Sequence, residues 1–169
     1  MLKVSSINIK KLRNEQFQKE LPEFFELKNF VENNSWHNND SIFNHTLAVL
    51  EELEKLLKSI NNKIKVYLNQ KIDEHTRKDL LFLGTLFHDI AKSNTLIKNG
   101  DLTSCPKHEE EGSEKVQAIL KRFDLSEREK AIVIKIQAAG TNTFFICIRA
   151  PPCTCCDASR RRSCSACRW

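Results

Sequence analysis

The adjacent pair His88-Asp89 is the feature of this sequence with the clearest chemistry. The pair lies inside an otherwise apolar segment, LLFLGTLFHDIA, where burial of a carboxylate beside an imidazole costs free energy unless a partner offsets it. A divalent cation is a suitable partner, because it accepts a neutral imidazole nitrogen and a carboxylate oxygen together. A third ligand must come from a neighbouring helix, and His45 is the obvious candidate. We therefore predict that His45, His88 and Asp89 hold a divalent metal ion.

The same residues also have simpler explanations. A His-Asp pair at the end of a helix can make a private hydrogen bond, and a histidine close to Leu47 and Leu50 can be a satisfied core residue. A two-residue motif also arises by chance in a chain of this length. The metal-site hypothesis therefore depends on the rest of the sequence.

Two long helices are predicted to carry these residues. From Ser41, apolar residues recur at helical spacing as far as Ile60, and Asp40 or Ser41 is the expected N-cap. This helix places His45, the candidate for the third ligand, one turn from its start. The second helix is predicted over residues 73–92, so that the His-Asp pair falls in its final turns.

Shorter helices are predicted on either side of these two, and we see no convincing strand. Four Gly and four Pro leave little turn material in 169 residues, which favours helices over a many-stranded sheet. The further predicted elements are one or two helices over residues 14–33 with Pro22 at a helix start, a short helix at 64–68, a turn at Asn99-Gly100, a helix over 109–123, and a final helix that follows the capping box Ser126-x-x-Glu129. We predict an all-α fold, a single globular bundle of about five to six helices.

Charge and hydropathy exclude several classes of protein. The net charge is +5, but residues 1–136 carry 18 Lys and 4 Arg against 15 Glu and 6 Asp, a balance of +1. This part of the chain therefore offers no sequence case for a nucleic-acid-binding surface. No apolar run approaches the roughly 18 residues of a membrane span, and the N-terminus lacks the apolar block of a signal peptide. We predict a cytoplasmic protein without a membrane segment.

The composition changes abruptly near residue 137. All 18 Lys lie at or before Lys135, whereas six of the seven Cys fall in the last 23 residues. A zinc-binding module, a basic interaction tail and a non-native tail produced by a frameshift all fit this change, and a disulfide framework is disfavoured without a secretion signal. We predict a helical domain over 1–136, with N-terminal helices over 1–34 and a motif-bearing core over 35–136, followed by an irregular, disordered or non-native tail over 137–169.

Three motifs follow one another along the chain. They are WHNNDSIFNHTLAVLEEL at 36–53, LFHDIAK at 86–92 and KHEEEGSEKV at 107–116. In this order they resemble the HD-domain superfamily of metal-dependent phosphohydrolases. The resemblance covers about residues 30–136 and is closest to the HD module of bacterial tRNA nucleotidyltransferases and to small standalone HD proteins.

The resemblance implies a role for each motif residue. His45, His88 and Asp89 correspond to the metal ligands of the family, and Asp89 also counts as a catalytic residue. Lys92 corresponds to a catalytic lysine that faces the substrate phosphate. His108 is similar to a later histidine that binds a second metal ion or the phosphate.

The sequence also departs from the family pattern. Related proteins close the metal site with an Asp from a later helix, whereas Asp101 and Asp124 fall in predicted loops and Asp157 in the tail. His37 resembles a histidine of the tRNA nucleotidyltransferase group and is a weaker candidate for substrate binding, since a loop histidine is usually only solvated. His75 is expected to be a surface residue near a helix start.

The function that the resemblance implies is metal-dependent hydrolysis of a nucleotide or another phosphate ester. The expected cofactor is a divalent ion such as Mn, Co, Ni, Mg or Fe. The expected partner is a small phosphorylated substrate, with RNA as a further candidate. The alternative is a non-catalytic or truncated HD module that binds nucleotide, RNA or a protein partner.

Overall fold

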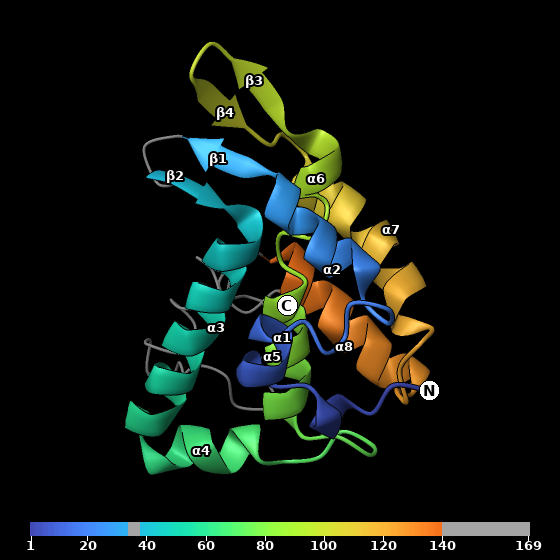
Figure 1. The fold of residues 1–169 in the computed structure, drawn as a ribbon. Helices are drawn as coiled ribbons and strands as arrows, with labels where there is room; N and C mark the ends of the chain where they lie inside the picture. Colours follow the sequence, from blue (N-terminus) through green and yellow to red (C-terminus); the bar gives the residue numbers. More distant parts are fainter. Residues whose placement is uncertain (34–37, 140–169) are drawn as a thin grey trace, which may run out of the picture.

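Helices form the frame of the domain (Figure 1). The computed structural model describes residues 1–33 and 38–139. In chain order the α-helices are α1 (Ile9–Arg13), α2 (Pro22–Glu26), α3 (Ile42–Ser59), α4 (Asn62–Leu68), α5 (Arg77–Leu86), α6 (Lys92–Thr95), α7 (His108–Leu120) and α8 (Glu127–Ala138). The strands are β1 (Val31–Asn33), β2 (Asn38–Ser41), β3 (Ile97–Asn99) and β4 (Leu102–Ser104), and 3-10 turns lie at Val4–Ser6 and Leu27–Asn29.

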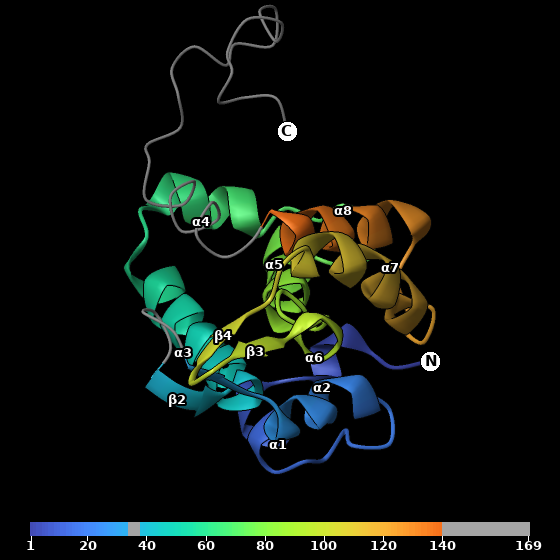
Figure 2. The same cartoon turned by 90° about the horizontal axis from the view of Figure 1, so that it is seen from above.

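Helix α5 runs through the middle of the domain. It packs against α3 on one side and α8 on the other, and α8 in turn packs against α7. Seen from above, α7 and α8 lie side by side, with α1 and α2 across the domain from α8 (Figure 2). Of the eight helices in the described residues, α1, α2 and α6 are single turns of four or five residues, and the other five have seven or more. The predicted all-α fold is confirmed, while the predicted domain limits stay a prediction.

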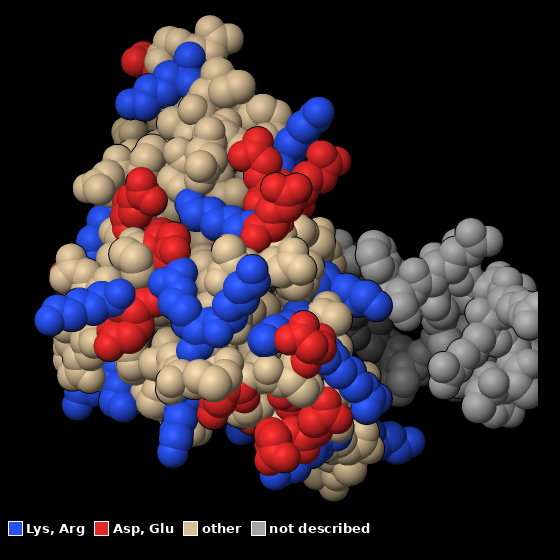
Figure 3. Space-filling model, turned by 90° about the vertical axis from the view of Figure 1, so that its right-hand side faces the viewer, with Lys and Arg blue, Asp and Glu red and all other residues tan. Residues whose placement is uncertain are grey.

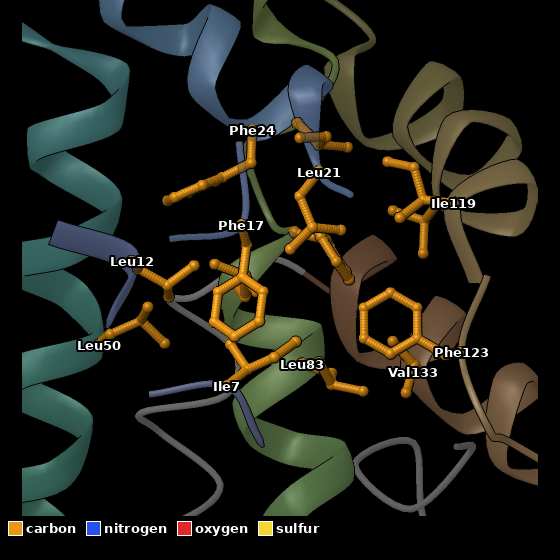
Figure 4. Close-up of a cluster of buried hydrophobic side chains, with 14 of the residues drawn as sticks. Ile7, Leu12, Phe17, Leu21, Phe24, Leu50, Leu83, Ile119, Phe123 and Val133 are labelled. Atoms are coloured by element: carbon orange, nitrogen blue, oxygen red, sulfur yellow. The ribbon is translucent and has the colours of Figure 1, made fainter. Parts of the chain in front are cut away.

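The core lies where these helices face one another (Figure 4). Each long helix turns an apolar stripe inward, with Leu50 from α3, Leu83 from α5 and Val133 from α8 all almost fully buried. Phe24 from α2 and Phe123 after α7 are also fully buried. Burial of a phenylalanine side chain contributes about 1.5–3 kcal/mol, so the N-terminal segment is an integral part of the core.

Helices α2, α3 and α8 begin where the sequence signals predict. The Ser41 side chain accepts a hydrogen bond from the Asn44 N–H at 3.1 Å, so Ser41 rather than Asp40 is the N-cap of α3. Ser126 and Glu129 form the predicted capping box at the start of α8. Helix α2 begins at its proline, as predicted.

The prediction of one helix over residues 73–92 is wrong at both ends. At the start, Thr76 and Asp79 form a reciprocal capping box, and α5 begins at the next residue after this cap. At the end, α5 stops at Leu86, and the next five residues form consecutive turns. The His-Asp pair therefore lies in tight turns after the helix.

The His88 side chain bonds to a backbone carbonyl at the C-terminal end of α5. Nδ1 of His88 lies 2.7 Å from the carbonyl oxygen of Thr85, which also accepts the His88 backbone N–H at 3.4 Å. In a longer helix, the Thr85 carbonyl would accept a hydrogen bond from a backbone N–H of the next turn. Because the His88 ring bonds to this carbonyl instead, the helix ends here.

Two short antiparallel strand pairs, β1–β2 and β3–β4, correct the prediction of a domain without strands. Strand β1 replaces the last residues of the helices predicted over 14–33, and the structure has turns over 14–20, so that only α2 and the 3-10 turn after it are helical in this range. The second pair is a hairpin with Gly100 at φ 62°, which confirms the turn predicted at Asn99-Gly100. The pairs are joined, because the Asn33 N–H donates to Thr103 Oγ1 at 2.8 Å. Strands of three or four residues are too short for alternation to reveal them.

Glu129 ties α8 to the segment before α5. Its buried carboxylate accepts the backbone N–H groups of Glu74 at 3.0 Å, His75 at 2.7 Å and Ser126 at 3.0 Å. The His75 ring lies 3.3 Å from Glu129 and 3.7 Å from Asp124, and its side chain is only 14% exposed, so the expectation of a surface histidine is wrong. Burial by itself would raise the pKa of Glu129, but these N–H groups and the ring stabilise the anion and lower the pKa to about 2.

Gly84 allows α5 and α8 to approach closely. A Cβ atom at this position would lie 2.4 Å from Ile136 Cγ2 and 2.6 Å from Ile136 Cβ. We expect Gly84→Ala to lower the free energy of unfolding by about 1–2 kcal/mol, because the cost of displacing α8 exceeds the gain in helix propensity. Urea denaturation of the variant and the wild type measures this difference. An Ile136→Ala background, which removes the nearest atom, should reduce the loss; equal stability of Gly84→Ala and wild type would contradict the close packing.

Candidate metal centre

Five of the residues singled out in the sequence meet at one end of the domain. His45 lies in the first turn of α3, Lys92 is the first residue of α6, and His108 is the first residue of α7. His88 and Asp89 lie in the turns between α5 and α6. In Figure 1 this is the upper end of the helical frame, close to the strand pairs. The fold thus brings together three stretches that are well separated in the sequence.

His45, His88 and Asp89 form a group of potential metal ligands. One ligand atom from each residue lies within 4.8 Å of the others. Asp89 Oδ2 lies 3.0 Å from His88 Nε2 and 3.6 Å from His45 Nε2, and the two rings have centroids 5.6 Å apart. His88 and Asp89 are buried, whereas the His45 side chain is 26% exposed. The group therefore lies below the surface and is accessible from the side of His45.

The hydrogen bond of His88 determines which nitrogen faces Asp89. Nδ1 contacts the carbonyl oxygen of Thr85, which can only accept, so we assign the ring proton to Nδ1. In the neutral ring, Nε2 then presents its lone pair to Asp89 Oδ2, which is also an acceptor. Neither of these two buried atoms makes a hydrogen bond of ordinary geometry within the described part of the chain, although the Lys92 ammonium lies 3.0 Å from Asp89 Oδ2. Among the described residues, the His88 nitrogen has no cation so close to it.

Two buried acceptors 3.0 Å apart repel each other unless a positive charge lies between or beside them. A divalent cation would satisfy both, since neutral imidazole nitrogen and carboxylate oxygen are ordinary ligands of such ions. Metal-binding histidines usually donate their other ring N–H to a carbonyl or carboxylate, as His88 does here. A doubly protonated His88 ring would also satisfy both atoms, and metal analysis separates these two states. The residues present fit a divalent metal ion.

His108 approaches the other oxygen of Asp89. Its Nδ1 lies 2.7 Å from the Cys105 carbonyl oxygen, which places the lone pair of the neutral ring on Nε2. Nε2 lies 3.6 Å from Asp89 Oδ1, and the side chain is 21% exposed. The position fits the predicted role in binding a second metal ion or the phosphate, which stays a prediction.

Lys92 is buried between two carboxylates. Its Nζ lies 3.0 Å from Asp89 Oδ2 and 2.7 Å from Glu32 Oε2, and the side chain is only 9% exposed. The ammonium group therefore faces Asp89 and Glu32 rather than open solvent. The predicted contact between Lys92 and substrate phosphate stays a prediction.

The charged groups of the centre hold one another ionised. Burial by itself would raise the pKa of Asp89, but a doubly protonated His88 ring and the Lys92 ammonium outweigh burial and keep the pKa below its usual range. With His88 neutral, the Lys92 ammonium is the remaining group that acts in this direction. Burial would lower the pKa of Lys92, but the Asp89 and Glu32 carboxylates raise it instead. Asp89 is therefore an anion, and thus a competent metal ligand, across the neutral range.

Glu32 is the residue of this centre that the sequence analysis missed. It lies on β1, is buried, and bonds to Lys92 at 2.7 Å. The thiol of Cys105 lies 3.6 Å from Glu32 Oε1, and burial together with this carboxylate raises the pKa of the thiol to about 12, so the thiol stays protonated. A glutamate after Phe30 and Val31 is ordinary in a helix, and no motif marks it. Only a correct strand prediction could have drawn attention to it.

Of the remaining sequence candidates, those that the structure describes do not join this group. His37, Asp157 and residues 140–169 of the predicted tail lie outside the described residues. Its first residues are not irregular, because Gln137 is buried and α8 ends at Ala138. Asp124 instead accepts the N–H of Val4 at 3.2 Å, and Asp101 lies in the exposed hairpin turn. Within the described residues, no aspartate after Asp89 completes the ligand set in the way that the family pattern implies.

The fold and the site together define an all-α domain with a histidine–aspartate candidate metal centre. The model of the HD domain family matches residues 42–142, which is more than half of the chain. This chain therefore belongs to the HD domain family. No curated protein and no solved structure matches it.

The surface of the domain is mixed in charge. On the face shown in Figure 3, basic and acidic side chains are interspersed, and no broad patch of one sign forms. This face thus offers no basic stripe for a nucleic-acid backbone, as the near-neutral balance of residues 1–136 predicts. No helix in the described part of the chain has both the length and the apolar character needed to cross a membrane.

Proposed function

We propose that this chain is a metal-dependent phosphohydrolase that acts on a phosphate ester, with a nucleotide as the expected substrate. The observation that carries the proposal is the pair of buried acceptor atoms, His88 Nε2 and Asp89 Oδ2, beside His45 in a chain of the HD domain family. These residues would hold Mn, Co, Ni, Mg or Fe. Without a thiolate in the group, a structural zinc site is disfavoured.

The residues of the chain prepare the site for phosphate chemistry. A divalent ion, when bound, supplies Lewis acidity and makes water more acidic. The Thr85 carbonyl orients the His88 ring, and the ionised Asp89 provides the anionic ligand. His45 and His108 retain the most solvent exposure of the group, so an incoming phosphate would meet the site between them. A protonated His108 would donate a hydrogen bond to a phosphate oxygen.

The substrate class rests on different kinds of support. A phosphate ester follows from the family and from the ligand types of the site. A nucleotide follows only from the resemblance of the motifs to the module attached to tRNA nucleotidyltransferases. The near-neutral charge balance of residues 1–136 favours a small substrate over a long nucleic acid.

Metal analysis and a substrate screen test the proposal together. Purified protein is analysed for bound metal by plasma mass spectrometry and is then assayed with Mn²⁺ or Co²⁺ against nucleoside monophosphates, p-nitrophenyl phosphate and its diester. We expect bound metal in stoichiometric amount, turnover of at least one substrate, loss of activity with a chelator, and recovery when metal is restored. Protein that binds no divalent ion and turns over no substrate would refute the proposal.

A non-catalytic HD module is the second candidate function. The observation that favours it is that no later aspartate within the described residues joins His45, His88 and Asp89. Such a module would bind a nucleotide in the presence of metal without releasing product. Calorimetric titration with nucleoside monophosphates, combined with the turnover assay, separates the two functions.

A further inference from the structure

Strand β1 places the buried carboxylate of Glu32 beside Lys92, next to the metal centre. The side chain of Glu32 is 4% exposed, although it comes from the N-terminal part of the chain, sixty residues before Lys92. Its position is secured on both sides. Glu32 pairs with Asp40 of β2, directly before α3, and the following residue, Asn33, bonds to Thr103 of the hairpin.

Glu32, Lys92 and Asp89 form a continuous chain of charges. The Lys92 ammonium lies 2.7 Å from Glu32 and 3.0 Å from Asp89 Oδ2, the same oxygen that faces His88 Nε2. Without Glu32, the charge of Lys92 would cancel that of Asp89. With Glu32 ionised, the three groups carry a net charge of −1.

We propose that Glu32 is a positioning residue of the metal centre, which holds Lys92 in place and raises the affinity of the site for a divalent cation. The inference rests on the metal site proposed above. Lys92 and a metal ion compete for the same Asp89 oxygen, because both are cations. Glu32 shares the ammonium and so weakens its hold on Asp89. It also adds a negative charge to a site in which Asp89 is the only carboxylate of the described ligand group.

The local contacts hold the Glu32 carboxylate in a fixed position. One carboxylate oxygen accepts from Lys92, and the other faces the protonated thiol of Cys105 at 3.6 Å. Groups one step removed from a metal commonly change affinity or activity by about 10–100-fold when they are substituted. Glu32→Gln keeps the shape and an acceptor oxygen but removes the charge, so it isolates the electrostatic part of the role.

The test compares Mn²⁺ affinity in full-length wild type, Glu32→Gln and a control, Glu52→Gln, by isothermal titration calorimetry. Glu52 is an exposed carboxylate two turns beyond His45 on α3, where solvent screens its charge. We expect Glu32→Gln to weaken the Kd for Mn²⁺ about 10–100-fold and the control to change it less than about twofold. At saturating Mn²⁺, kcat of Glu32→Gln should return close to the wild-type value, a recovery that a general loss of structure would not show.

Two substitutions are expected to change Mn²⁺ affinity in opposite directions, so a folding defect in one of them does not decide the test. Lys92→Met removes the competing cation, so it is expected to bind Mn²⁺ at least as tightly as wild type. If Glu32→Gln does not fold, a Lys92→Met variant that binds more weakly than wild type overturns the inference. Equal Kd values for Glu32→Gln and wild type also overturn it while leaving the proposed function intact. If the wild type binds neither Mn²⁺ nor any other of the proposed divalent ions and turns over no substrate, the proposed function fails and the role of Glu32 fails with it.

Discussion

Replacement of His88 by alanine is expected to abolish stoichiometric divalent-metal binding and to lower phosphatase activity by more than about 100-fold, because loss of a direct ligand should exceed the effects of groups one step removed from a metal. The reason is that His88 Nε2 and Asp89 Oδ2 are the two buried atoms that the ion would satisfy, and Thr85 already aims the ring at the site. Metal content and kcat/KM, measured on the same preparation, check this result. A variant that retains both the ion and turnover would contradict the assignment of His88 as a ligand.

His75→Gln is the matched control for His88→Ala. His75 is also a partly buried histidine beside a carboxylate, but it lies against Glu129 rather than in the metal centre. Its substitution should lower stability while metal content stays at the wild-type level. Unfolding in excess chelator adds a second readout. If His88 is neutral, its removal costs the Thr85 hydrogen bond and side-chain packing but relieves an acceptor–acceptor contact, whereas removal of a doubly protonated ring also breaks a buried ion pair and costs several kcal/mol more.

Glu129→Ala is expected to lower the free energy of unfolding by about 3–5 kcal/mol at neutral pH. The substitution leaves three backbone N–H groups, those of Glu74, His75 and Ser126, without their carboxylate acceptor, and each loss of this kind costs about 1–3 kcal/mol before relaxation. Urea denaturation measures the change. Glu127→Ala is the control on the same helix, because the Glu127 side chain is 90% exposed and its loss should cost less than about 0.5 kcal/mol. Equal losses in the two variants would contradict the role of Glu129.

The lowered pKa of Glu129 also predicts how stability depends on pH. Folding shifts the pKa from 4.5 to about 2, so the native state favours the anion. The resulting stabilisation, about 3 kcal/mol, is fully present above pH 4.5 and is lost as the pH falls towards 2. In Glu129→Gln this part of the acid sensitivity should disappear. An unchanged pH profile of the variant between these limits would show that the carboxylate does not titrate as expected.

The metal-site candidates could be predicted because their chemistry is unusual in its local context. A His-Asp pair in an apolar segment is costly without a partner, and that cost is visible in the sequence itself. His45 and His108 could be assigned because each occupies a recognisable motif in the right order. The N-caps at Ser41 and Ser126 were predictable for the same reason, since a cap depends on residues within one turn of each other.

Residue types and spacing by themselves therefore determined the fold class, the starts of α2, α3 and α8, and the histidine–aspartate group. The tertiary structure alone decided the end of α5 at Leu86, the two strand pairs, and the burial of Glu32 and Glu129. The physical reason is the range of the interactions. Glu32 meets Lys92 across sixty residues, and Glu129 meets His75 across fifty-four. A glutamate is common on the solvated face of a helix, so its residue type does not predict burial. Only the packing of distant segments makes Glu32 and Glu129 buried residues.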